Sequence, residues 1–195
     1  ILNESTSRDI TLPFVTISGR TVDGNGVAVA GVEVNLDFTS LPSVNDGSTR
    51  QIGGQVISDA SGNYAFSIYP HNDYSVSLVP PESASDLAVT PLQGVDFSTS
   101  DNTRDLVLQQ GVTLSGTVYL PDGVTPASGV ELQVFDSSSP DNSLAKFVTD
   151  GAGVYSFSLV PGTYDVQLFV NSSSVGSYIG AFIASKYLGA LILNE

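Results

Sequence analysis

The stretch SDASGNYAFSIYP (58–70) decides the fold, and TDGAGVYSFSLVP (149–161) nearly repeats it. Each begins with an Asp-led turn, continues through a glycine, and then alternates large apolar residues with small ones. The alternation places the large residues on one face of a strand in each copy: Tyr64, Phe66 and Ile68, then Tyr155, Phe157 and Leu159. This pattern is typical of the scaffold of an all-β protein and does not indicate a catalytic site.

The repeat extends over most of the chain. Ser18-Gly19 reappears as Ser115-Gly116, and Gly31-Val32-Glu33-Val34 reappears as Gly129-Val130-Glu131-Leu132. Short apolar runs separated by Gly, Pro, Asn and Asp predict two tandem antiparallel β-sandwich modules of Ig-like or prealbumin-like type. We place module 1 at 13–110 and module 2 at 111–195. Pro13 marks the seam because the apolar parity changes there.

Within module 1 the pattern predicts strands at 14–19, 31–38, 55–58, 64–68 and 74–78, and a closing strand at 105–108. The ranges 39–54 and 80–104 are expected to be loops, because they are rich in polar residues, Gly and Pro. Segment 177–193 is ambiguous, since Gly180 and Gly189 weaken a helix. We expect a β-rich ending there and no membrane insertion, because Lys186 interrupts the apolar run.

Composition excludes several functions. Twenty acidic residues against six Lys and Arg give a net charge of -14, so the chain lacks the basic surface that nucleic acid or anionic lipid requires. No cysteine is present, which excludes disulfides and thiolate metal sites. The first residues lack the basic region of a signal peptide, so we take the chain as a mature form or a fragment. The expected location is extracellular, at the cell surface.

The two ends of the chain carry the same tetrapeptide, Ile1-Leu2-Asn3-Glu4 and Ile192-Leu193-Asn194-Glu195. In addition, SRDITL (7–12) resembles TRDLVL (103–108), the predicted closing strand of module 1. Residues 1–12 therefore look like a closing strand with no module before it, whereas module 2 has no closing strand of its own. Superposing Ile192 on Ile1 lets residues 1–12 of a second copy close module 2.

This match predicts head-to-tail assembly of identical copies by strand complementation, with an interface at Ile1, Leu2, Ile10, Leu12, Ile192 and Leu193. A contact of this type that does not close on itself forms a fibre. The next copy is either continuous in the polypeptide, as in a tandem-repeat protein, or a separate subunit. The competing interpretation is that residues 1–12 fold back on their own module 2. Solvated side chains at Ile10 and Leu12, or their packing on this chain's own module 2, would rule out assembly.

The motifs resemble bacterial surface repeats of the carboxypeptidase-regulatory-like and collagen-adhesin B-type (prealbumin-like) superfamily. They are SGTV (115–118), GVEL (129–132), TDGAGVYSF (149–157) and PGTYDV (161–166); module 1 departs at PHNDY (70–74), which lacks the glycine. The resemblance implies a sandwich used in secreted stalks, adhesins and filaments. Some relatives carry a Lys–Asn crosslink with the lysine on the opening strand, where this chain has Arg20 and Thr117.

Candidate chemistry is sparse. Asp59 and Asp150 lead the repeated turn, followed by Gly62 and Gly153, and we interpret all four as structural turn residues. The two aspartates are weak Ca²⁺ candidates, because no spacing matches a calcium loop. His71 is the one histidine and lies in a predicted turn. We expect no cofactor and no enzyme activity.

The sequence therefore favours a structural subunit or repeat of an extracellular filament or stalk. The alternative is an adhesin module that binds carbohydrate or protein on another surface. That alternative requires exposed aromatic residues on loops, whereas Tyr64, Tyr155 and Tyr164 are at predicted core positions.

Overall fold

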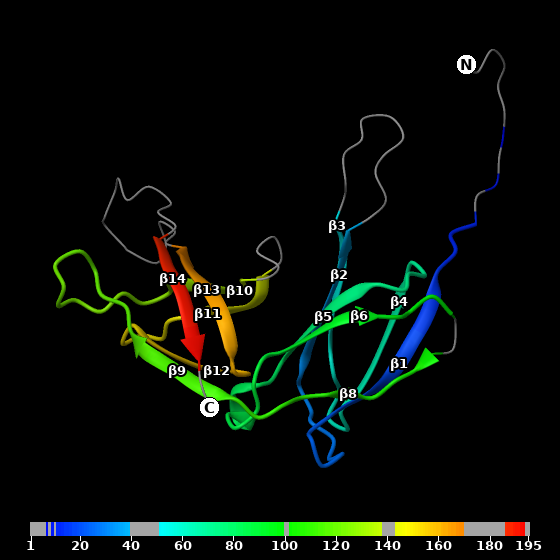
Figure 1. Cartoon of the computed structure of the whole chain (residues 1–195), viewed down its shortest axis with the longest axis horizontal. Helices are drawn as coiled ribbons and strands as arrows, with labels where there is room; N and C mark the ends of the chain where they lie inside the picture. The colour runs from blue at the N-terminus through cyan, green and yellow to red at the C-terminus, as the bar shows by residue number, and fades with distance from the viewer. Residues whose placement is uncertain are drawn as a thin grey trace.

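The structure is a computed structural model that describes residues 7, 9, 11–39, 51–99, 102–137, 143–169 and 186–193. Within these residues the regular structure is β, apart from the single 3₁₀ turn η1 (Glu82–Ala84). Figure 1 shows two groups of strands, β1–β8 and β9–β14, arranged as sandwiches. The predicted all-β sandwich fold is confirmed.

In module 1, β1 (Val15–Val22) pairs antiparallel with β4 (Asn63–Ile68). A second sheet has the order β3-β2-β5-β6, with bounds Gln51–Ile57, Glu33–Thr39, Tyr74–Val79 and Thr90–Val95. The closing strand forms β7 (Asn102–Thr103) and β8 (Leu106–Val107), both on the other side of β1. These two short strands run parallel to β1, which differs from the antiparallel pairing expected throughout.

Module 2 repeats the arrangement. Strand β9 (Val112–Thr117) pairs antiparallel with β12 (Val154–Leu159). The other sheet has the order β11-β10-β13-β14, with bounds Ser143–Val148, Glu131–Asp136, Gly162–Phe169 and Lys186–Leu193. Strand β14 confirms the β-rich ending expected from the sequence. It lies beside β13 as β6 lies beside β5, because Leu191 pairs with Tyr164 as Val95 pairs with Tyr74.

Each pair of sheets encloses an apolar cluster. In module 1 the cluster includes Ile17, Val34 and Tyr74, all buried, and in module 2 it includes Leu132 and Tyr164. Val89 belongs by sequence to module 1 but packs in the second cluster. The apolar alternation of the sequence therefore forms two cores, which meet at a shared joint.

Two expected loops contain strands. Strand β3 begins at Gln51, although we predicted a loop up to residue 54. Gly53 suggested a loop, but it is needed in the strand, because a Cβ there would be 2.8 Å from the Leu36 carbonyl oxygen. Strands β6 and β7 both lie inside the predicted 80–104 loop. Pro91 and Gly94, which has a φ of 64°, interrupt the strand pattern of β6, but β6 is an edge strand and tolerates both.

The repeated turn holds its strands by hydrogen bonds to the leading carboxylate. Asp59 Oδ1 accepts hydrogen bonds from the backbone N–H groups of Ser61 and Asn63, both at 2.8 Å. The hydrogen bond from the Asn63 backbone N–H is the main reason that the pKa of Asp59 is below its ordinary value. Gly62 completes the turn with a φ of 77°, a region that favours glycine.

Replacing Gly62 by Ala should destabilise the fold more than replacing Gly26 by Ala. Both glycines have φ near 80°, so both substitutions share a conformational cost of about 1–2 kcal/mol. A Cβ at Gly62 would lie 3.0 Å from the Thr21 carbonyl oxygen, whereas a Cβ at Gly26 would have no neighbouring atom within 4 Å. We expect Gly62→Ala to cost roughly 1–3 kcal/mol more in urea unfolding. Equal losses would contradict the close packing of this turn.

Candidate assembly interface

The closing strand of module 1 is held on β1 by backbone hydrogen bonds and by two leucines. The Arg104 N–H donates to the Ser18 carbonyl at 2.9 Å, and the Leu108 N–H donates to the Val22 carbonyl at 2.8 Å. Leu106 and Leu108 are both fully buried in the core, whereas Val107 between them is exposed. The strand therefore completes the backbone pairing of β1 and also covers the core.

Two features of module 1 fit the backbone at Arg104. An added Cβ on Gly19 would lie 1.8 Å from the Arg104 carbonyl oxygen, so the strand approaches this closely only beside a glycine. The same oxygen accepts a hydrogen bond from Tyr64 Oη at 2.7 Å. Burial raises the pKa of Tyr64 to about 12, so its hydroxyl remains a donor at neutral pH.

An ion pair at the rim supplements these contacts. Asp105 accepts hydrogen bonds from the Arg20 backbone N–H at 3.1 Å and from its guanidinium at 2.9 Å. The guanidinium is the main reason that the pKa of Asp105 is below its ordinary value. Both side chains are nearly half exposed, so this pair contributes little compared with the buried leucines.

Strand β9 of module 2 corresponds to β1, and it is paired differently. It pairs with β12, but on its other side the described residues provide no strand equivalent to β7 and β8. The backbone groups of Ser18, Arg20 and Val22 that face the closing strand correspond to those of Ser115, Thr117 and Tyr119. Within the described ranges, this edge of β9 is therefore open.

The core beneath that edge is less covered than in module 1. Ile17 and Tyr64 are fully buried, but their counterparts Leu114 and Tyr155 are half-buried. The contrast is larger at the rim, where Val22 is 3% exposed and its counterpart Tyr119 is 52% exposed.

In the facing sheet, two pairs of corresponding positions have equal burial. Leu132 and Val166 are as buried as Val34 and Val76, which occupy the same positions in module 1. The lower burial at Leu114 and Tyr155 is not shared by these two positions, although Leu168 is half-buried where its counterpart Leu78 is fully buried.

Module 2 retains the residues that receive the strand in module 1. Gly116 occupies the position of Gly19, and the atoms nearest to an added Cβ there belong to the Tyr155 side chain. Among the described residues, none forms a hydrogen bond with the Tyr155 hydroxyl. Thr117 replaces Arg20, so the rim ion pair has no equivalent guanidinium here. The Ser-Gly repeat and the paired tyrosines were visible in the sequence, but their contact with a closing strand was not.

The predicted interface residues are partly described. Leu12 is 64% exposed, and Ile1, Leu2 and Ile10 lie outside the described residues. Exposure of Leu12 argues against its packing on this chain's own module 2. The condition against assembly required both Ile10 and Leu12 to be solvated, and Ile10 lies outside the described residues, so the condition is met at Leu12 alone. The donor role therefore stays a prediction.

Ile192 and Leu193 lie in β14, where they pair with Thr163 and Gly162 of β13. This position is in the four-stranded sheet, whereas β9 pairs with β12 in the other sheet. Their role in assembly also stays a prediction.

The repeated Asp-led turn has the same backbone hydrogen bonds in both modules. Asp150 Oδ1 accepts hydrogen bonds from the N–H groups of Ala152 and Val154, as Asp59 does in module 1, and Gly153 has a φ of 71°. Among the described residues, no group of three or more His, Asp or Glu side chains could hold a metal ion. His71 Nδ1 accepts a hydrogen bond from the Asp73 N–H, and its ring packs edge-on against Tyr74. His71 therefore contacts residues of its own turn and of the strand that follows it.

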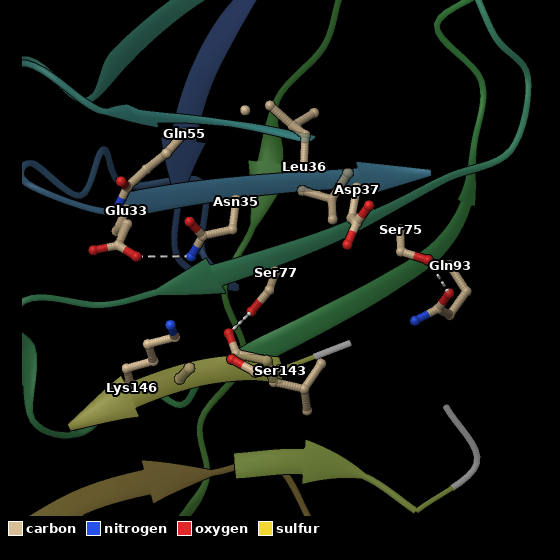
Figure 2. A pocket seen from close by; sticks show the side chains of 14 residues that line it. Glu33, Asn35, Leu36, Asp37, Gln55, Ser75, Ser77, Gln93, Ser143 and Lys146 are labelled. Carbon is tan, nitrogen blue, oxygen red and sulfur yellow. Dashed lines mark hydrogen bonds between the residues drawn. The ribbon is translucent and has the colours of Figure 1, made fainter. Parts of the chain in front are cut away.

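A cavity of about 460 Å³ lies where the two modules meet. Figure 2 shows its polar lining, with Glu33 accepting a hydrogen bond from Asn35 and the Ser77 hydroxyl donating to the backbone of β11. The Ser77 hydrogen bond to the Leu144 carbonyl links β5 to β11 across the joint. The cavity lining includes no exposed aromatic platform.

No protein-family model matches the chain, and no curated protein matches it. The assignment to the carboxypeptidase-regulatory-like and collagen-adhesin B-type superfamily therefore stays a prediction. Among the described residues, no helix reaches the length and hydrophobicity needed to cross a membrane.

Solved structures resemble the chain at low identity. They include the TIE protein of Bacillus anthracis (18% identity, TM-score 0.37, 94% of this chain and 32% of that chain). A streptococcal ancillary pilin has 15% identity and a TM-score of 0.33, over 94% of this chain and 59% of that chain. A candidate carbohydrate-binding protein of Bacteroides uniformis has 14% identity and a TM-score of 0.34, over 93% and 99%. The chain thus spans less than two thirds of the first two proteins.

The hydroxyl groups of Tyr64 and Tyr155 should differ in their contribution to stability. Tyr64→Phe leaves the Arg104 carbonyl without its buried donor, so we expect a loss of about 1–2 kcal/mol in the free energy of unfolding. Tyr155→Phe removes a hydroxyl with no recorded partner, so in a dilute single chain we expect a change within about 0.5 kcal/mol. Urea unfolding of both variants measures the difference. A larger loss for Tyr155→Phe would refute the open edge of β9.

Proposed function

We propose that the protein is a structural subunit or repeat of an extracellular, cell-surface filament or stalk, assembled head to tail by strand complementation. The observation that carries the proposal is the open edge of β9, which retains the glycine and tyrosine that receive the closing strand in module 1. The proposed occupant of this edge is segment 7–12 of a second copy of the chain.

The register of the donated strand follows from module 1. There, Leu106 pairs with Thr21 and Val107 with Val22, in parallel. The same register pairs Ile10 with Val118 and Thr11 with Tyr119. It buries the side chains of Ile10 and Leu12, as Leu106 and Leu108 are buried, and leaves Thr11 outward. The Arg8 carbonyl is then placed to accept from the Tyr155 hydroxyl.

The position of β14 supports this route for the chain. In module 1, Leu106 of the closing strand follows Val95 of β6 by 11 positions (106 − 95), and Leu191 of β14 has the place of Val95. With Ile192 superposed on Ile1, Leu191 takes the position just before residue 1 of the next copy. Ile10 of that copy then follows Leu191 by ten positions. A strand that continues from β14 therefore has nearly the length that the same connection has in module 1.

The gain from assembly is similar in size to the cost of ordering the donated strand. Burying Ile10 and Leu12 contributes roughly 1.5–3 kcal/mol each, and each backbone hydrogen bond adds about 1 kcal/mol net. Ordering the six donated residues costs about 1–2 kcal/mol each, which offsets much of that gain. Covalent continuity would reduce the remaining cost, because the donor would then be held near its acceptor.

Paired aspartate substitutions should test the donor strand. In the full chain, Ile10→Asp with Leu12→Asp should abolish association in sedimentation velocity, because both side chains enter the core. Thr11→Asp is the matched control, since its counterpart Val107 points outward, and it should associate like the unsubstituted chain.

A two-copy chain fused through the shared tetrapeptide covers the case of covalent repeats. Its first module 2 should unfold at a higher urea concentration than module 2 of a single copy. The paired aspartates in the second copy should remove this gain, and Thr11→Asp should not. Absence of both association and stabilisation would refute the proposed function.

A further inference from the structure

Where the two modules of the chain meet, a segment of module 1 covers the edge of β12 in module 2. Among the described residues, the corresponding edge in module 1 is not covered. The Val89 N–H donates to the Ser158 carbonyl at 2.9 Å, and Val89 bridges Leu159 in parallel. The Ser158 hydroxyl donates to the Ser85 carbonyl at 3.1 Å. Segment 85–89 of module 1 thereby covers the edge of β12 that does not pair with β9, and Phe157, Ser158 and Leu159 are buried.

The same edge of module 1 is open among the described residues. Strand β4 corresponds to β12, and its pairing with β1 leaves its other side without a strand partner there. Ser67, the counterpart of the buried Ser158, is exposed, and Phe66 and Ile68 are half-buried. The two modules thus have complementary gaps: module 2 has an open β9 edge, and module 1 has an open β4 edge.

Two exposed aromatic residues continue this edge. Val15 pairs with Ile68, so Phe14 and Tyr69 lie just beyond the end of the β1–β4 ladder. They are 57% and 46% exposed. We call Phe14, Phe66, Ser67, Ile68 and Tyr69 the β4 edge patch.

We infer that the β4 edge patch is a second contact surface between copies, and that it packs against module 2 of the preceding copy. This inference rests on the proposed function. The donated strand ends at Leu12, and consecutive Cα atoms are 3.8 Å apart, so Phe14 lies within about 8 Å of the strand that enters the preceding copy. Docking segment 7–12 on β9 therefore brings the patch next to that copy's module 2.

The contact between copies differs from the joint inside the chain in one respect. Gly111 has the position of Phe14, and an added Cβ there would lie 2.4 Å from the Ala88 Cβ. A phenylalanine cannot approach a backbone so closely, so the joint between copies must be wider and aromatic. Phe14 and Tyr69 provide the apolar surface for it, in place of Gly111 and Val160.

The absence of cysteine allows a direct test in the fused two-copy chain, because one introduced thiol is the only one present. Ser67→Cys in the second copy should react with a thiol reagent at least about tenfold more slowly than Ser67→Cys in the first copy, whose patch has no preceding module. Ser61→Cys, in an exposed turn, is the control and should react equally in both copies. Adding Phe14→Ser and Tyr69→Ser to the second copy should restore fast reaction at position 67.

A second reporter separates this inference from the proposed function. Tyr119→Cys lies at the open rim of β9, so the donated strand should protect it in the first copy and leave it reactive in the second. Protection at position 119 with equal reaction at position 67 in both copies would overturn the β4 edge patch and leave the donor strand intact. Equal reaction at both positions in both copies would overturn both proposals.

Discussion

The structure of each module depends on how closely a closing strand can approach the opening strand. In module 1 that approach is set by Gly19, whose missing side chain lets the Arg104 carbonyl come into contact with β1. The Tyr64 hydroxyl then satisfies this carbonyl, and Leu106 and Leu108 fill the core on either side of the outward Val107. A glycine, a tyrosine and two leucines therefore act together, and each has less effect without the others.

Module 2 shows what the same scaffold looks like when the described residues include no closing strand. Gly116 and Tyr155 are present, yet Tyr155 and Leu114 are half-buried and the Tyr119 side chain lies at the surface. The joint inside the chain has the opposite effect on β12, whose residues 157–159 are buried by segment 85–89 of module 1. Among the described residues, module 1 is covered beside β1 and open beside β4, whereas module 2 is covered beside β12 and open beside β9.

Sequence periodicity predicted the strands with clean alternation and failed where glycine or proline interrupts it. Tyr64, Tyr164 and Val34 were placed correctly in the cores, because a period of two leaves one arrangement per face. Strand β6 was missed because Pro91 and Gly94 are tolerated at a sheet edge, and edge position depends on distant partners. The parallel pairing of β8 with β1 was also not predictable, since strand direction follows from the path of the chain between residues 95 and 106. The candidate interface followed from repeats in the sequence, but its geometry required the comparison of burial between modules.

The charge of the chain restricts how copies could come together. Each copy carries a net charge of -14, so two copies repel each other wherever they meet by their general surface. Among the described residues, the two open edges, β9 and β4, instead present backbone groups and apolar side chains, and short-range contacts there are weakened little by that repulsion. Side-by-side aggregation of exposed edges is the usual hazard of β proteins. Strong like charge opposes lateral contacts over long distances, so under the proposed donation of a strand the same composition would favour linear growth over lateral aggregation.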